Sequence, residues 1–111
     1  MANGLLGKQV SQTNQFVLLY EVPATGVEFA TVTIHVLNMH TDIAQVDVAI
    51  TNAATPTDAD FIGYKDELVA EGGVVEYNCY TVSPGEKIYM RSNNNRTTGR
   101  VHGLEKPDLG A

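Results

Sequence analysis

Few residues in this chain have side chains suited to catalysis or metal binding, and their spacing matches no common motif. The three histidines are His35, His40 and His102, and in principle they could meet Asp42 or Asp47 to form a metal site. His35 and His40 are five residues apart and Asp42 follows two residues later, which fits no short zinc or calcium pattern. We therefore expect no metal site. His35 falls on the polar face of an alternating strand, so we expect it to make hydrogen bonds at the surface or at an interface.

The only cysteine, Cys79, is predicted to be a core thiol and not a nucleophile. It alternates with Val75 and Tyr77, a pattern typical of a small side chain buried in a sheet. No Gly-x-Ser-x-Gly turn is present to expose a catalytic serine. A single cysteine also excludes an intrachain disulfide.

Neighbouring carboxylates have structural explanations that need no acid–base chemistry. Asp58 follows Thr55 and Pro56, which together predict the start of a short helical turn through residues 60–62, with one of its two apolar residues on the core. The adjacent acids at 66–67 are expected to charge an edge strand against aggregation. The glycines are scattered at turns, so no phosphate-binding loop is formed. The sequence thus predicts a protein with no catalytic residue, no bound metal and no cofactor.

Composition narrows the class of protein further. The chain has 111 residues, 43% of them hydrophobic and 18% charged, and a net charge of −6. This is the composition of one globular domain, and an acidic surface disfavours binding to nucleic acid or to anionic lipid. No apolar run approaches the ~20 residues needed to cross a bilayer. The N-terminal residues do not resemble a signal peptide, so we expect synthesis in a cytoplasm.

Alternation of apolar and polar residues along most of the chain predicts β-strands. The clearest run places Ala30, Val32, Ile34 and Val36 on one face. Because turn signals recur and no amphipathic helix is present, the fold class is all-β: an antiparallel β-sandwich, jelly-roll or immunoglobulin-like, with about seven or eight strands. The predicted strands span residues 16–22, 30–36, 44–50, 64–70, 74–82, 87–92 and 98–104.

Two of these strands, 30–36 and 44–50, are joined by a short polar link and are predicted to form an antiparallel hairpin with one wet face. The apolar faces of the alternating strands should line the core between two sheets. The predicted core residues are Ala30, Val32, Ile34, Val36, Ala44, Val46, Val48, Ile50, Ile88 and Val101.

The first 15 residues are predicted to be an extended N-terminal arm outside the sandwich. They are rich in Asn, Gln, Ser and Thr, with Leu5, Leu6 and Val10 as isolated apolar side chains. Such a segment buries too little surface to offset the cost of its own ordering, ~1–2 kcal/mol per residue for the backbone. We expect it to dock on a neighbouring molecule; the alternative is an extra edge strand of its own sandwich. The predicted organisation is an arm over 1–15, a sandwich over 16–105 and a tail over 106–111.

Charge is unevenly distributed along the chain. Residues 42–86 hold nine acids and one base, whereas residues 87–111 hold five bases and two acids. The segregation has two explanations: chance distribution over solvated faces, or docking and self-association through complementary edges. On the second explanation, the predicted docking residues are Leu5, Leu6, Val10, Lys87, Arg91, Arg96 and Arg100.

Several segments together resemble small virion proteins of tailed bacteriophages, of the kind carried by cyanobacterial and other marine phages. The resemblance covers about Gly4 to Glu105, and it consists of strand and turn patterns. The segments that carry it are GLLGKQV, VPATGVEFATVTIHVLN, AATPTDADFI, SPGEKIYMRS and GRVHGLE.

This resemblance implies a non-enzymatic structural protein present in many copies on the virion, most simply a capsid decoration (cement) protein that binds the major capsid lattice. A tail, baseplate or fibre component is an alternative, and so is a receptor- or carbohydrate-binding β-sandwich module. The implied partners are the major capsid protein or other virion proteins, with no specific nucleic acid and no membrane. A homo-oligomer is expected, and a trimer would suit a capsid lattice.

Overall fold

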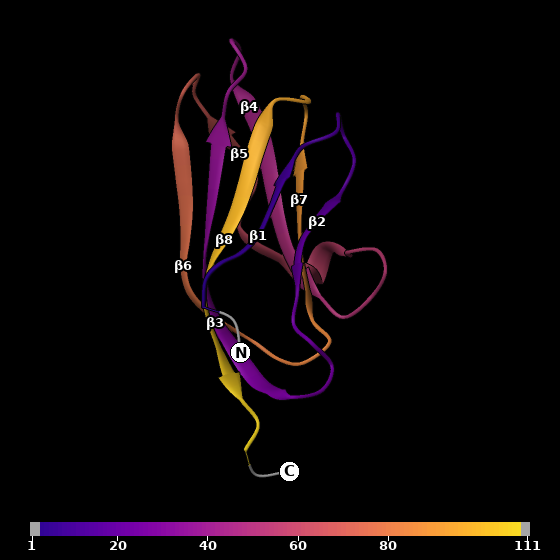
Figure 1. The fold of residues 1–111 in the computed structure, drawn as a ribbon. Helices are drawn as coiled ribbons and strands as arrows, with labels where there is room; N and C mark the ends of the chain where they lie inside the picture. The colour runs from indigo at the N-terminus through magenta and orange to yellow at the C-terminus, as the bar shows by residue number, and fades with distance from the viewer. Residues whose placement is uncertain (1–2, 110–111) are drawn as a thin grey trace.

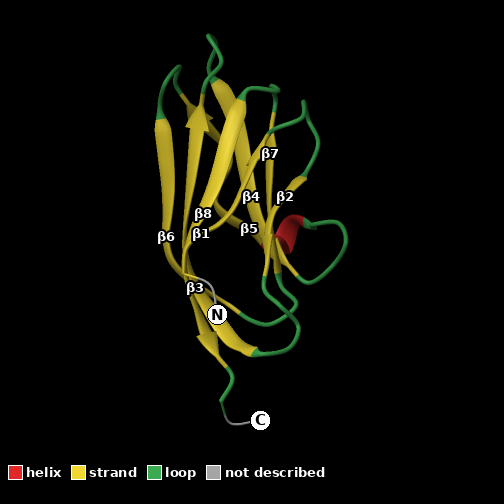
Figure 2. Ribbon diagram, in the orientation of Figure 1, coloured by secondary structure: helices red, strands yellow, loops and turns green. Residues whose placement is uncertain are grey.

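Two antiparallel sheets pack face to face, as seen in a computed structural model that describes residues 3–109, the side chains of residues 3 and 64 excepted (Figure 1). The first sheet has the strand order β1-β8-β3-β6, and the second has the order β2-β7-β4-β5. The predicted all-β antiparallel sandwich is therefore confirmed (Figure 2). The elements are β1 (Asn3–Val10), β2 (Val17–Glu21), β3 (Val27–Asn38), β4 (Ala44–Thr51), the 3-10 turn η1 (Asp58–Asp60), β5 (Phe61–Val69), β6 (Val74–Val82), β7 (Lys87–Ser92) and β8 (Thr97–Pro107).

Branched aliphatic side chains from both sheets fill the space between them. All ten predicted core residues lie in this layer: nine are buried, and Ile50 is half-buried and packs against them. Ile34 of the first sheet and Ile88 and Met90 of the second are among the largest side chains that are fully buried. With no tryptophan in the chain, the core depends on the area that these aliphatic residues remove from water.

The predicted hairpin between the runs at 30–36 and 44–50 is wrong, because the two strands lie in different sheets. β3 pairs with β6 and β8, whereas β4 pairs with β5 and β7. The link after Asn38 crosses from one sheet to the other instead of turning back. Both arrangements bury the same alternating face, so alternation cannot distinguish paired strands from facing strands.

The N-terminal segment is not an arm outside the fold. Residues Asn3–Val10 form β1, which pairs antiparallel with β8 along its whole length. Backbone pairing and the packing of Leu6 against the core offset the ordering cost that composition alone suggested. The sandwich thus begins at β1 and not at residue 16, and its last strand continues to Pro107. Residues 1–2 of the predicted arm and 110–111 of the tail lie outside the described residues.

Close packing at Gly7 shows how firmly β1 belongs to the sandwich. A Cβ added at Gly7 would lie 1.9 Å from the carbonyl oxygen of Leu19 in β2. β1 therefore contacts the second sheet as well as its neighbour β8, and it closes the sandwich along one side. Only glycine permits this approach of two backbones.

Cys79 is exposed, so its predicted place in the core is wrong. Opposite Thr33 of β3, the strand β6 carries an extra residue: Val32 pairs with Tyr80, whereas Ile34 pairs with Tyr77. Cys79 adopts a left-handed φ of 62° within this bulge. The extra residue changes which side chains of β6 point towards the core, because one inserted residue moves every later side chain to the other face.

The predicted helical turn exists, but it ends at Asp60: residues 61–62, which were expected within it, are the first residues of β5. η1 spans Asp58–Asp60 and is preceded by Thr57, whose N–H donates to Asp60 Oδ2 at 2.8 Å. This backbone hydrogen bond lowers the pKa of Asp60. Ile62 packs against the core, as one of the two alternatives predicted.

Candidate functional site

The outer face of the first sheet combines apolar and basic side chains. Cross-strand register places Lys8, Arg100, His35 and Glu76 in one row across β1, β8, β3 and β6. A neighbouring row places Leu5 beside His102. The exposed apolar side chains of this face are Leu5, Val10, Val74 and Leu104. This face therefore offers both apolar area and positive charge at the surface.

Three of the seven predicted docking residues, Leu5, Val10 and Arg100, lie together on this outer face. Leu5 and Val10 are 42% and 53% exposed, and Arg100 is exposed between them on β8. Leu6 does not join them, because its side chain packs against the core. Successive side chains of a strand point to opposite faces of the sheet, so Leu5 and Leu6 lie on opposite faces of β1.

The other basic docking residues do not form one patch with them. Lys87 and Arg91 belong to β7 in the second sheet, and Arg96 lies in the turn between β7 and β8. Arg91 is engaged by Asp47 and is half-buried. The predicted basic edge is therefore divided among two sheets and a turn.

Two histidines meet on the outer face of the first sheet. The rings of His35 and His102 lie edge to face with centroids 5.5 Å apart, and His35 Nδ1 is 3.5 Å from Glu76 Oε1. This agrees with the expectation that His35 makes polar contacts on the outer face of its strand. Within the described part of the chain, no three His, Cys, Asp or Glu side chains lie close enough to hold a metal ion.

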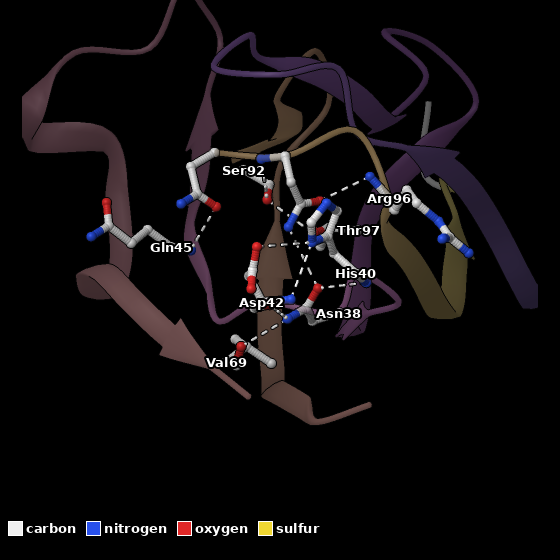
Figure 3. Close-up of polar contacts among 10 residues, drawn as sticks. Asn38, His40, Asp42, Gln45, Val69, Ser92, Arg96 and Thr97 are labelled. Atoms are coloured by element: carbon white, nitrogen blue, oxygen red, sulfur yellow. Dashed lines mark hydrogen bonds and ion pairs between the residues drawn. The ribbon is translucent and has the colours of Figure 1, made fainter. Parts of the chain in front are cut away.

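A buried polar network closes one end of the sandwich, where the links after β3 and β7 meet (Figure 3). The fully buried Asn38 donates from Nδ2 to the carbonyl oxygens of Asp42 and Val69, at 2.8 and 2.9 Å, and its Oδ1 accepts from the N–H of His40. Beside it, the hydroxyls of Ser92 and Thr97 are 2.9 Å apart. Because buried amides and hydroxyls cost free energy unless paired, this network holds the crossing loop in place and has a structural role.

A cavity of about 220 Å³ opens on the outer side of the second sheet. At its base is the nearly buried carboxylate of Asp47, whose Oδ2 accepts from Arg91 Nη2 at 2.8 Å and whose Oδ1 accepts from the N–H of Asp66 at 2.6 Å. Asp47 was expected on the wet face of a hairpin. Its burial arises because β5 carries several extra residues opposite it, which wrap around the carboxylate: Val46 pairs with Glu67 and Val48 with Ile62. The cavity is lined by Asn14, Gln45, Asp47, Asp66, Arg91, Ser92 and Asn93.

Three aromatic rings adjoin this cavity. The ring of Phe16 lies 6.0 Å from that of Phe61 and 6.2 Å from that of Tyr89. The Arg91 guanidinium carbon lies 4.5 Å from the centroid of Phe16 and 5.7 Å from that of Phe61. Arg91 therefore joins the aromatic cluster to Asp47, and cation–π attraction supports its position.

Two tyrosines have unusual acid–base properties because they are enclosed by the core. Burial raises the pKa of Tyr20, and the hydrogen bond from its hydroxyl to Glu105 Oε2 raises it further. Burial, followed by the charges of Glu67 and Asp47, raises the pKa of Tyr77 to about 12. Both phenols therefore stay protonated well above the ordinary range of tyrosine.

The fold and these surfaces define an all-β sandwich protein with two distinct candidate surfaces, one on each sheet. Comparisons with protein-family models, with curated proteins and with solved structures find no match to this chain. Among the described residues, no helix is long and apolar enough to cross a membrane.

The cavity and its aromatic border were missed by sequence reasoning, for a physical reason. Phe16, Phe61 and Asp47 come from three segments that are distant in the sequence, and only the strand order of the second sheet joins them. The sequence carried no signal for it: Asp47 occupies a regular polar position of β4 between Val46 and Val48, and only the structure places it opposite Arg91. Asp47 was counted in the acidic segment 42–86 and Arg91 in the basic segment 87–111, so the charge counts did not indicate that the two residues pair.

Proposed function

We propose that this chain is a non-enzymatic structural protein of a tailed-phage virion, a decoration protein that binds the major capsid lattice. It would be synthesised in the bacterial host cytoplasm and reside on the surface of the particle. The proposal starts from the resemblance over Gly4–Glu105. One structural observation supports it most directly: a four-stranded sheet face that carries Leu5, Val10 and Arg100 together.

The outer face of the first sheet suits repeated, modest contacts. Its exposed apolar side chains supply area to bury, and Lys8 and Arg100 supply positive charge on a chain whose net charge is −6. On a lattice, many copies of a weak contact give stable occupancy, because the partner sites are held at high effective concentration. Positive charge within an acidic protein also orients it towards acidic lattice surfaces.

Copy number on purified particles tests this proposal. Quantitative mass spectrometry against the major capsid protein should find hundreds of copies per particle, a figure of the order expected for repeated lattice contacts. A few to tens of copies would indicate a tail, baseplate or fibre component, which is the alternative. Absence from particles would refute a virion role altogether.

Substitutions on the docking face test its role in binding. Leu5→Ser and Arg100→Glu should lower occupancy on particles while the thermal midpoint of the isolated protein stays nearly unchanged, because both side chains are exposed. Lys87→Glu, on the second sheet, is the matched control and should bind as the wild type does. Equal losses for all three variants would contradict docking through this face.

We also propose that the protein forms a trimer, and this oligomeric state can be measured separately. Light scattering at high micromolar concentration should give a mass three times the 12.0 kDa of the chain. A stable monomer at that concentration would rule out a preformed ring.

A further inference from the structure

The cavity on the second sheet has an unused set of hydrogen-bonding groups. The side chains of Asn14, Gln45 and Asp66 border it and make no hydrogen bond to any other residue that the structure describes. Arg91 uses its Nε and Nη2 on Asp47, and its Nη1 makes no hydrogen bond within residues 3–109. The side chains of Asn14, Gln45 and Asp66 are exposed, so their donors and acceptors are available to a ligand at the cavity.

The walls of this cavity are held rigidly. The loop that carries Asn14 is fixed by a hydrogen bond from its N–H to the carbonyl oxygen of Ser92, at 2.8 Å. The Asp47 carboxylate fixes the bulge of β5 through the N–H of Asp66. The backbone around the cavity is therefore held in place before a ligand arrives, and only side chains would have to be ordered on binding.

The aromatic cluster supplies a second kind of contact at the same place. Phe16, Phe61 and Tyr89 are half-buried and form one cluster of rings around Phe16; they do not line the cavity themselves. Arg91 lines the cavity and stacks on Phe16, so the polar and aromatic surfaces are continuous. Such a border suits a ligand with a polar edge and an apolar C–H face.

We propose that this cavity and its aromatic border bind one neutral sugar unit of a glycan. A pyranose ring has hydroxyls around its edge, which donate and accept hydrogen bonds, and C–H groups on its faces, which pack on aromatic rings. The volume of about 220 Å³ is below the ~300–1,000 Å³ typical of pockets for drug-sized ligands, so it suits a single ring.

Charge excludes the main competitors. Two carboxylates, Asp47 and Asp66, face one guanidinium, Arg91, so the lining is negative overall. A phosphate or an acidic sugar would be repelled, and Arg91 is already neutralised by Asp47. The inference does not depend on the proposed virion role, because a sugar site can be present or absent in a decoration protein.

The test is a titration of the full chain followed by two-dimensional amide NMR. Glucose, galactose, mannose and N-acetylglucosamine are added separately at millimolar concentrations, and inorganic phosphate serves as the anionic probe. At least one sugar should shift the side-chain amides of Asn14, Gln45 and Asn93 and the Arg91 Nε–H, with saturation. Phosphate should leave them unchanged. If no sugar shifts these signals, or if phosphate alone does, the proposal is overturned.

Two variants connect the binding to these residues. Gln45→Ala removes an exposed side chain, and Asn14→Gly removes an amide at a φ of 58° that glycine adopts without strain. Each should weaken sugar binding about two- to tenfold, the range for one lost hydrogen bond. Gln9→Ala, in β1 of the first sheet, is the matched control and should bind as the wild type does. Unchanged affinity in both cavity variants would overturn the proposal, and circular dichroism checks that all three fold.

Discussion

The phenol of Tyr20 donates a hydrogen bond to the carboxylate of Glu105, and the contact joins the two sheets. Tyr20 lies in β2 of the second sheet and Glu105 in β8 of the first, and both residues are buried. A hydrogen bond to a charged acceptor away from water is among the stronger polar contacts in a protein. Here it connects sheets that otherwise meet mainly through aliphatic side chains.

This contact predicts that stability decreases at alkaline pH. Burial and Glu105 raise the pKa of Tyr20, so the folded state holds the phenolic proton more tightly than the unfolded state does. The resulting stabilisation is fully present below the ordinary tyrosine pKa of ~10 and is lost as the pH rises above it. Urea unfolding at a series of pH values should therefore show a falling free energy of unfolding above pH ~10.

The variant Tyr20→Phe isolates this effect. It should cost about 1–3 kcal/mol near neutral pH through loss of the hydrogen bond to a carboxylate. It should also make the alkaline decrease shallower, because one of the tyrosines with a raised pKa is gone. Tyr89→Phe, which removes a hydroxyl that bonds the Ala54 carbonyl at the surface, is the control. Identical pH profiles for the wild type and Tyr20→Phe would contradict the assignment.

The place of β1 in the fold predicts strong sensitivity at Gly7. Gly7→Ala would put a Cβ 1.9 Å from the carbonyl oxygen of Leu19, so β1 and β2 must separate. We expect a loss of about 1–3 kcal/mol, as is typical of overpacking, and a lower thermal midpoint by calorimetry. Gln9→Ala in the same strand is exposed and should have little effect. If Gly7→Ala is as stable as Gln9→Ala, then β1 detaches in solution and serves as the docking arm first predicted.

Alternation of residue types was sufficient to predict the fold class and the core, but not the partner of each strand. It placed Ile34 and Val46 correctly inside, because burial of one face is a local property of each strand. The sheet to which β3 and β4 belong depends on a crossing held by Asn38, which bonds groups as distant in the sequence as Val69 and Gly73. The bulge at Cys79 was also hidden, because nothing in an alternating pattern marks the point where one residue is inserted.

For the candidate surfaces too, the sequence predicted some of the residues but not how strand pairing brings them together. Leu5 and Val10 were predicted as docking residues because they are isolated apolar side chains near the N-terminus, and Arg100 because the last third of the chain is basic; they lie on one face because β1 pairs with β8. The cavity needed the second sheet to bring Asn14, Asp47 and Arg91 together. Contacts across long sequence separations decide such a site, and a single sequence does not report them.

The core assignment predicts a large cost for Ile34→Ala. Ile34 is fully buried in β3, so truncation removes transfer free energy and leaves a cavity. We expect a loss of ~2–5 kcal/mol in urea unfolding. Thr33→Ala on the outer face of the same strand should cost much less. If Ile34→Ala loses less than about 1 kcal/mol, the core collapses readily around this position.

The bulge in β6 predicts that Cys79 is reactive in the native protein. Cys79 is exposed, and its φ of 62° places it outside the regular hydrogen-bond ladder of β6. Ellman's reagent should therefore modify the folded protein at close to the rate seen in urea, because the thiol is accessible without unfolding. A thiol that reacts only after unfolding would restore the original prediction of a core cysteine.

The pair of Asp47 and Arg91 should show strong energetic coupling. Asp47 is nearly inaccessible and accepts hydrogen bonds from Arg91 and from the N–H of Asp66, so Asp47→Ala leaves a half-buried guanidinium without its carboxylate. We expect Asp47→Ala and Arg91→Ala each to cost about 1–3 kcal/mol, and the double variant to cost less than the sum. The measurement is a double-mutant cycle by urea unfolding, with a coupling energy of about 1–2 kcal/mol. Because salt screens this partly enclosed pair weakly, the coupling should persist at high ionic strength. If the two losses are additive, or if the coupling energy disappears at high salt, the pair is an ordinary surface ion pair, since exposed pairs contribute little and are readily screened.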